Sequence, residues 1–314
     1  GTEAVEAAYK LARWHTKKKW TIAFDPCFHG RTMGSLSMTY SHPVQRKRFE
    51  PFLPVKHVPY PDYYRFKGSN SECNNNSLNA IEKQFKNLRG KIASIFFEPV
   101  SGEGGYLVPE KSFVKDLRKL CNKYNILLVA DEVQSGCYRT GEFLAMENYG
   151  VVADIVSLSK AIGGGIPLGA TIAKSSIMDW ETGAHANTFG GNLIACAAGV
   201  ATLKFLKKTK AGLNAKRRGK EFMKILNELK DENEIIGDVR GLGLMIGIEL
   251  VKSKKSKKPA IKERQKILCK AVEKGLLLLP AGNSVIRICP PLTISKNQVE
   301  QGMEIFEESI KEAL

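Results

Sequence analysis

Residues 154–165 read Asp-Ile-Val-Ser-Leu-Ser-Lys-Ala-Ile-Gly-Gly-Gly. An apolar run here ends in a lysine, and glycines follow soon after. The pattern predicts a buried strand with Lys160 in the loop at its carboxyl end, beside little water. Because desolvation favours the neutral amine, Lys160 is a candidate nucleophile toward a carbonyl carbon. For this stretch alone, a lysine that opens a surface turn is the simpler interpretation.

A second apolar run lies upstream, where residues 126–136 read Ile-Leu-Leu-Val-Ala-Asp-Glu-Val-Gln-Ser-Gly. Asp131 follows the apolar residues directly, so we expect it at the carboxyl end of a buried strand. A buried carboxylate needs a cationic or hydrogen-bonding partner. Pyridoxal phosphate needs both features, a lysine for its aldehyde and an acid for its ring nitrogen. Taken alone, Asp131 as a helix cap or as the partner of a basic side chain remains the simpler interpretation.

Three motifs together carry a resemblance to a known family. Residues 130–136, residues 154–165, and the sequence Thr-Phe-Gly-Gly-Asn at 188–192 resemble the class III (omega-type) pyridoxal-phosphate aminotransferases, above all the 4-aminobutyrate and acetylornithine enzymes. The resemblance implies an α/β protein of fold type I, the aspartate-aminotransferase-like fold. It implies a large, mainly parallel sheet domain at 1–211 and a small C-terminal α+β domain at 212–314.

The resemblance also implies a cofactor pocket. Lys160 would hold pyridoxal phosphate covalently and act as the catalytic base, while Asp131 would keep the ring nitrogen protonated. Gln134 would donate to the phenolic oxygen of the cofactor. Phe28 would cover the ring face, and Glu98 would support the pocket.

The phosphate of the cofactor has its own candidate residues. Gly1 and Thr2 come directly before a helical pattern, and a helix start presents free N–H groups to an anion. An ordinary helix cap explains them equally well. The resemblance makes them the phosphate loop, and it implies that Thr188 reaches the phosphate from a partner subunit, hence a homodimer with shared sites. The family also has a segment before this loop, so we expect this chain to be a fragment.

Substrate recognition is implied at three charged residues. Arg31 would bind the distal carboxylate of an omega-amino acid, as a guanidinium binds a carboxylate bidentately. Glu103 would pair with Arg287, and the pair would open or close according to which substrate is bound. A surface arginine and a purely structural ion pair are the alternatives. His29 is expected to be structural rather than catalytic.

Composition restricts the remaining possibilities. The chain of 314 residues has a net charge of +16 and seven scattered cysteines. Scattered cysteines favour a reducing compartment, hence a cytoplasmic protein without a zinc site. The densest basic run, 252–258, has no interleaved aromatic residues, so we expect neither nucleic-acid nor membrane binding. Residues 51–79 are rich in Pro, Tyr and Asn, and this composition predicts a long surface excursion.

We therefore expect a ping-pong transamination from an omega-amino acid, first of all 4-aminobutyrate, to 2-oxoglutarate. Three alternatives stay open. An acetylornithine or ornithine aminotransferase and an amino-acid racemase would use the same lysine and cofactor. A basic, non-catalytic binding protein would differ in class, and the intact Lys160, Asp131 and Gln134 argue against it.

Overall fold

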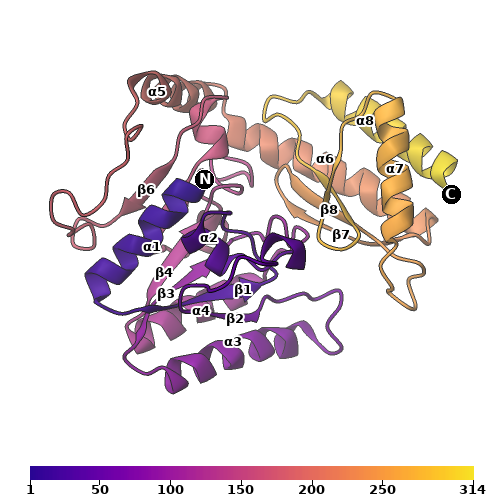
Figure 1. The fold of residues 1–314 in the computed structure, drawn as a ribbon. Coiled ribbons are helices and arrows are strands. Elements are labelled where there is room, and N and C mark those ends of the chain that lie inside the picture. The colour runs from indigo at the N-terminus through magenta and orange to yellow at the C-terminus, as the bar shows by residue number, and fades with distance from the viewer.

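The computed structural model describes all residues from Gly1 to Leu314. It contains two separate β-sheets, a larger one in the first part of the chain and a smaller one toward the C-terminus (Figure 1). Helices α5 (Leu193–Lys208) and α6 (Ala211–Glu232) connect the two parts. No helix is both long enough and apolar enough to cross a membrane.

The large sheet has the strand order β2-β1-β3-β4-β5-β6. All neighbouring strands run parallel except β5 and β6, which are antiparallel. The mainly parallel sheet predicted from the sequence is thus confirmed. Its strands are β1 (Trp20–Asp25), β2 (Val55–Pro59), β3 (Ile92–Phe97), β4 (Leu127–Asp131), β5 (Ile155–Leu158) and β6 (Ala170–Ala173).

Helices cover both faces of this sheet (Figure 1). Helix α1 packs on β3, β5 and α2, whereas α4 packs on β4 and α3. Strand β3 is buried along its whole length, as expected for a central strand with helices on both sides. The bounds are α1 (Thr2–Thr16), α2 (Met33–Met38), α3 (Asn70–Asn87) and α4 (Lys111–Tyr124), with short 3-10 helices η1 (Pro43–Gln45), η2 (Ala145–Tyr149) and η3 (Lys160–Gly163).

The small sheet is antiparallel throughout, in the order β7-β8-β10-β9. Helices α6 and α7 pack on it, and α8 packs on both helices. Its elements are β7 (Ile236–Leu242), β8 (Met245–Leu250), α7 (Ile261–Glu273), β9 (Leu279–Ala281), β10 (Val285–Ile288) and α8 (Lys296–Ala313). The proposed boundary between residues 211 and 212 falls in the first turn of α6.

The expectation of a long surface excursion at 51–79 was wrong. This stretch contains β2 and the first ten residues of α3. Ser69 accepts from the backbone N–H of Glu72, and the Glu72 side chain accepts from the backbone of Ser69, so a complete capping box starts the helix. Buried Cys73, Ser77 and Ile81 then recur every four residues, and this buried face outweighs the poor helix propensity of asparagine.

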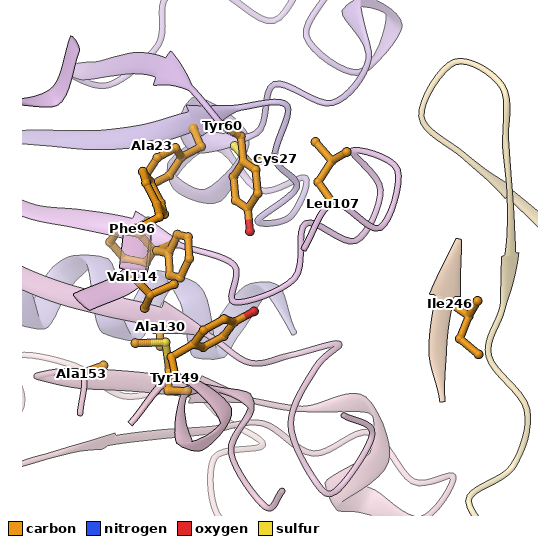
Figure 2. Close-up of a cluster of buried hydrophobic side chains, with 14 of the residues drawn as sticks. Ala23, Cys27, Tyr60, Phe96, Leu107, Val114, Ala130, Tyr149, Ala153 and Ile246 are labelled. Carbon is orange, nitrogen blue, oxygen red and sulfur yellow. The ribbon is translucent and has the colours of Figure 1, made fainter. Parts of the chain in front are cut away.

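The core of the large domain also fixes the loop after β3. Figure 2 shows Tyr60 and Tyr149 among the buried side chains, with their hydroxyl groups at the edge of the cluster. The hydroxyl of Tyr60 donates to the carbonyl of Glu98 at 2.9 Å, and that of Tyr149 donates to the carbonyl of Pro99 at 2.7 Å. Two core aromatic residues therefore hold the backbone that carries Glu98.

Candidate active site

Asp131 is the last residue of β4, and its closest partner is a buried histidine. The Asp131 Oδ2 atom lies 2.7 Å from His29 Nδ1, and both side chains are almost fully buried. The other oxygen of Asp131 accepts from the backbone N–H of Val133 at 3.1 Å. Burial lowers the pKa of His29, but the neighbouring Cys27 and Asp131 outweigh burial and raise that pKa well above 6.5.

His29 is the site residue that sequence reasoning undervalued. Its backbone N–H and that of Gly30 donate to Thr39 Oγ1 at 2.9 and 3.2 Å, which fixes the loop that carries the imidazole. The ring also lies edge-on to Phe96, with centroids 5.7 Å apart. His29 and Asp131 are 102 positions apart in the chain. No local sequence signal links them.

Lys160 lies at the same edge of the sheet as Asp131. Asp131 and Ser157 are paired in the parallel register of β4 and β5, and Lys160 follows closely after β5. Lys160 has a left-handed backbone with φ 45°, and Gly164 and Gly165 continue the turn with φ 57° and 108°. The expectation that Lys160 sits beside little water was wrong. In a single copy of the chain, Lys160 is exposed to solvent.

The start of α1 lies next to this lysine. A Cβ on Gly1 would lie 4.0 Å from the Cβ of Ser159, the residue before Lys160, so the helix start and the lysine loop are neighbours. The Thr2 hydroxyl lies 2.8 Å from that of Thr32 and 2.5 Å from that of Ser35. The N–H groups before Val5 have no acceptor within the helix, as at any free helix start.

A cavity of about 660 Å³ opens at this helix start. Gly1, Thr2 and Ser159 line it from one side, and residues 187–191 contribute Asn187, Phe189, Gly190 and Gly191. Free helix N–H groups and hydroxyls suit an anion such as a phosphate. Thr188 itself is exposed and does not line this cavity within one chain.

The side chains of Glu98 and Gln134 both lie against the backbone of Gly102. Glu98 accepts from the backbone N–H groups of Phe28 at 3.0 Å and Gly102 at 3.2 Å, and burial raises its pKa to about 7. A Cβ on Gly102 would lie only 2.3 Å from Gln134 Oε1. That amide oxygen is buried and has no hydrogen-bond partner. Glycine at 102 therefore makes room for the Gln134 side chain.

The charged residues of the candidate substrate pocket lie on two different parts of the fold. Arg287 of β10 donates to Glu103 Oε1 at 2.7 Å, so the structure contains the ion pair that the resemblance implies. Arg31 is exposed, and its guanidinium lies 5.7 Å from the ring centroid of Phe28. Arg31 is free of carboxylate partners in the structure, whereas Arg287 is occupied.

One strip of exposed apolar side chains runs from the edge of the cavity along α5. We call it the apolar strip, and it consists of Phe189, Leu193, Ile194, Val200 and Phe205. Leu193 is 85% exposed and Phe189 is 79% exposed. Side chains of this size, gathered on one segment, are typical of a protein contact surface.

These residues fit one kind of cofactor. An amine at Lys160 and a buried carboxylate at Asp131 lie at one edge of the sheet, and the start of α1 lies beside Ser159 at the same edge. An aldehyde, a basic ring nitrogen and a phosphate are the groups that these features suit, and pyridoxal phosphate carries all three. The fold and this site define a pyridoxal-phosphate-dependent enzyme.

Comparison with known proteins gives the family. Residues 1–310 match the family Aminotransferase class-III, and the chain belongs to that family. It is similar to acetylornithine aminotransferase of Clostridium acetobutylicum, with 40% identity over 99% of this chain and 75% of that protein. It is also similar to 5-aminovalerate aminotransferase of Pseudomonas aeruginosa, with 39% identity over 99% of this chain and 74% of that protein.

Other similarities extend the range of named activities. Leucine/methionine racemase of Thermococcus litoralis is 35% identical over 99% of this chain and 71% of that protein. Among solved structures, a PLP-bound amine transaminase from an uncultivated Pseudomonas species matches with a TM-score of 0.94 and 30% identity, over 100% of this chain and 76% of that chain. The chain is a pyridoxal-phosphate-dependent aminotransferase with the fold of these enzymes.

Proposed function

We propose that the protein transfers the amino group of an omega-amino acid, first of all 4-aminobutyrate, to 2-oxoglutarate by a ping-pong mechanism. The observation that carries the proposal is the pairing of Arg287 with Glu103 while Arg31 has no carboxylate partner. Free Arg31 suits a donor with one distal carboxylate. An acceptor with two carboxylates would need the second arginine as well.

In this proposal the residues at the sheet edge bind the cofactor. Lys160 would hold the aldehyde carbon, and Asp131 would pair with the ring nitrogen. Bound pyridoxal phosphate supplies an electron sink for the carbon that loses a proton. His29, hydrogen-bonded to Asp131, keeps that carboxylate oriented. Gln134 follows Asp131 by three positions and would contact the phenolic oxygen.

Residues around the cavity would contact the ring face and the phosphate of the cofactor. Phe28 would cover the ring face, and Glu98 fixes the backbone of Phe28. Gly1 and Thr2 would bind the phosphate at the start of α1. Thr188 from a second copy of the chain completes the phosphate site.

Proton transfer belongs to Lys160. With the cofactor bound and its lysine released by the donor amine, the Nζ atom of Lys160 would take the proton from the amino-bearing carbon and pass it to the cofactor, which leaves the lysine neutral. In the second half-reaction the same atom gives a proton to the former carbonyl carbon of the acceptor. The positive φ of Lys160 and the glycines after it support this role, because they fix the lysine backbone in a tight turn.

Arg31 and Arg287 bind the carboxylates of the two substrates in this proposal. Arg31 binds the distal carboxylate of both substrates. When 2-oxoglutarate enters, Arg287 leaves Glu103 and binds the α-carboxylate. While Arg287 is paired with Glu103, its charge is neutralised, and a donor without an α-carboxylate leaves no unpaired arginine in the cavity. When a substrate with an α-carboxylate enters, that carboxylate replaces Glu103 as the partner of Arg287. One cavity can therefore accept both kinds of substrate.

A homodimer with shared active sites is part of the proposal. The apolar strip supports it, because the strip continues from Phe189 at the cavity along α5. Association across this strip would bring residues of a second copy, including Thr188, to the phosphate site. A cytoplasmic location without nucleic-acid or membrane binding completes the proposal.

Absorbance spectra of the purified protein with pyridoxal phosphate test the proposal. We expect 4-aminobutyrate to bleach the visible band of the bound cofactor and 2-oxoglutarate to restore it. Lys160→Ala should abolish both changes and leave the fold intact, because this side chain is exposed. Bleaching by acetylornithine but not by 4-aminobutyrate would assign the donor differently. Loss of optical rotation from an L-amino acid without a keto acid would indicate a racemase.

A further inference from the structure

Arg240 of β7 binds the loop that carries Glu103. Its Nη2 and Nε atoms donate to the carbonyl oxygen of Gly105 at 2.7 and 3.2 Å. Its guanidinium also donates to Asp238 at 2.9 Å and to Glu249 at 2.7 Å. The Arg240 side chain is only 13% exposed, so its carboxylate partners compensate a buried charge. Arg240 therefore ties a backbone carbonyl of the large domain to the small sheet.

Arg240 and Arg287 stand in one row across the small sheet. Arg240 pairs with Gly247 in the register of β7 and β8, and Arg287 pairs with the same Gly247 in the register of β10 and β8. Residues directly opposite each other in antiparallel strands share a face of the sheet. The two arginines consequently flank Gly247 on the same face, and both reach the same loop.

Gly247 makes room for this loop. A Cβ at position 247 would lie 2.9 Å from the Cβ of Tyr106 and 3.4 Å from the carbonyl oxygen of Gly105. The loop is also held by the N–H of Gly282, which donates to the carbonyl of Glu103 at 2.8 Å. Backbone contacts thus position the loop independently of the Glu103 side chain.

The two arginines hold different parts of the loop. Arg287 binds the carboxylate of Glu103, and Arg240 binds backbone two residues further on. If Arg287 leaves Glu103 during the reaction, the Arg240 contact remains. The Glu103 carboxylate then stays within reach of Arg287 and competes with any α-carboxylate in the cavity.

We propose that Arg240 is a positioning residue that sets substrate selectivity by holding the Glu103 loop, residues 101–107, against the row Arg240–Gly247–Arg287. The proposal rests on the function proposed above for Glu103 and Arg287. Without Arg240 the loop keeps the contact between the Gly282 N–H and the Glu103 carbonyl but loses the one at Gly105, so it is held less firmly against the small sheet. Arg287 then spends more time unpaired, and donors with an α-carboxylate gain over donors without one.

Arg65 provides a matched control. Its Nε atom donates to Glu249 Oε1 at 3.1 Å, so it belongs to the same network of charges. It contacts Glu249 and the carbonyl of Lys257 but not the Glu103 loop. Loss of Arg65 therefore disturbs the charge network and leaves the loop contact in place.

The experiment compares half-reactions of the holoenzyme with 4-aminobutyrate and with L-glutamate as donors. In Arg240→Gln we expect the ratio of kcat/KM for 4-aminobutyrate to that for L-glutamate to fall roughly tenfold, the effect of one lost charge-assisted hydrogen bond. In Arg65→Gln the ratio should stay at the wild-type value. Gly247→Ala, which pushes the loop without removing a charge, should lower the ratio as well. An equal loss for both donors in Arg240→Gln would overturn the proposal.

Hydrogen exchange separates this inference from the proposed function. We expect faster amide exchange in residues 101–107 of Arg240→Gln than of wild type or Arg65→Gln, whichever donor the enzyme uses. A wild-type protein that accepts no omega-amino acid would refute the proposed function, while exchange would still test the loop contact. Unchanged exchange in Arg240→Gln would overturn the positioning role even if transamination is confirmed.

Discussion

Replacement of His29 tests the buried pair behind the candidate cofactor site. His29→Ala would leave the Asp131 carboxylate buried without its imidazole partner. His29→Asn keeps a neutral donor of similar reach. The two variants separate the hydrogen bond from the charge on the imidazole.

The expected magnitudes follow from burial. Both side chains are almost fully buried and 2.7 Å apart, so removal of one partner should cost about 3–5 kcal/mol of stability. The asparagine variant should recover part of this loss, because a neutral hydrogen bond contributes about 0.5–1.5 kcal/mol and a charged one about 1.5–3 kcal/mol. We therefore expect His29→Ala to be the less stable variant near neutral pH.

The pH dependence has a defined sign. The pKa of folded His29 lies well above its unfolded value of 6.5. Folding therefore takes up a proton between these two pKa values, and the stability from the charged pair is fully present below pH 6.5. This contribution decreases as the pH rises through the folded pKa. The advantage of wild type over His29→Asn should shrink in the same direction.

Urea denaturation of the apoprotein from pH 6 upward measures these differences. The reasoning is refuted if His29→Ala costs less than about 1 kcal/mol, because a buried unpaired carboxylate must cost more than that. It is also refuted if the difference between wild type and His29→Asn grows as the pH rises.

Three further predictions concern other parts of the fold. Gly102→Ala places a Cβ 2.3 Å from Gln134 Oε1. We expect this variant to bind pyridoxal phosphate more weakly in a titration and to lose about 1–3 kcal/mol of stability. An unchanged cofactor affinity would contradict the role of Gln134. Phe24→Ala removes a buried ring from three edge-on aromatic contacts. The variant should lose about 3–5 kcal/mol of stability in urea denaturation. A loss of stability under about 1 kcal/mol would show that the core collapses into the space that the ring leaves. Leu193→Glu should yield a monomer in sedimentation. Val152→Glu is the control: Val152 is 77% exposed and lies outside the apolar strip, so this variant should stay dimeric. A dimeric Leu193→Glu would exclude the strip as the interface.

The sequence predicted where in the fold two of the candidate site residues lie, because their positions depend on local pattern. Asp131 and Lys160 each follow an apolar run, and each run is a strand of the parallel sheet. Parallel strand ends meet at one edge, so the two residues could be placed together without coordinates. The resemblance then implied the pairing of Glu103 with Arg287, and the structure contains this ion pair.

The missed features have physical reasons. His29 pairs with Asp131 only through the assembled sheet, and no periodicity encodes that contact. The exposure of Lys160 depends on what covers the loop, not on the apolar run before it. Helix α3 was predictable in part, because Ser69 followed by Glu72 is a capping-box signal that the asparagine content concealed.

The antiparallel strand β6 has a consequence for the order in which the site forms. Leu158 and Ala170 pair across the turn that begins at Lys160, so this end of the site is a local hairpin with low contact order. Local contacts form faster than contacts that close long loops. The pairing of His29 with Asp131, 102 positions apart, must wait for the parallel sheet. A complete chain that refolds from the denatured state would therefore form its lysine turn before its acid–imidazole pair, and tight cofactor binding would appear only once the parallel sheet has formed.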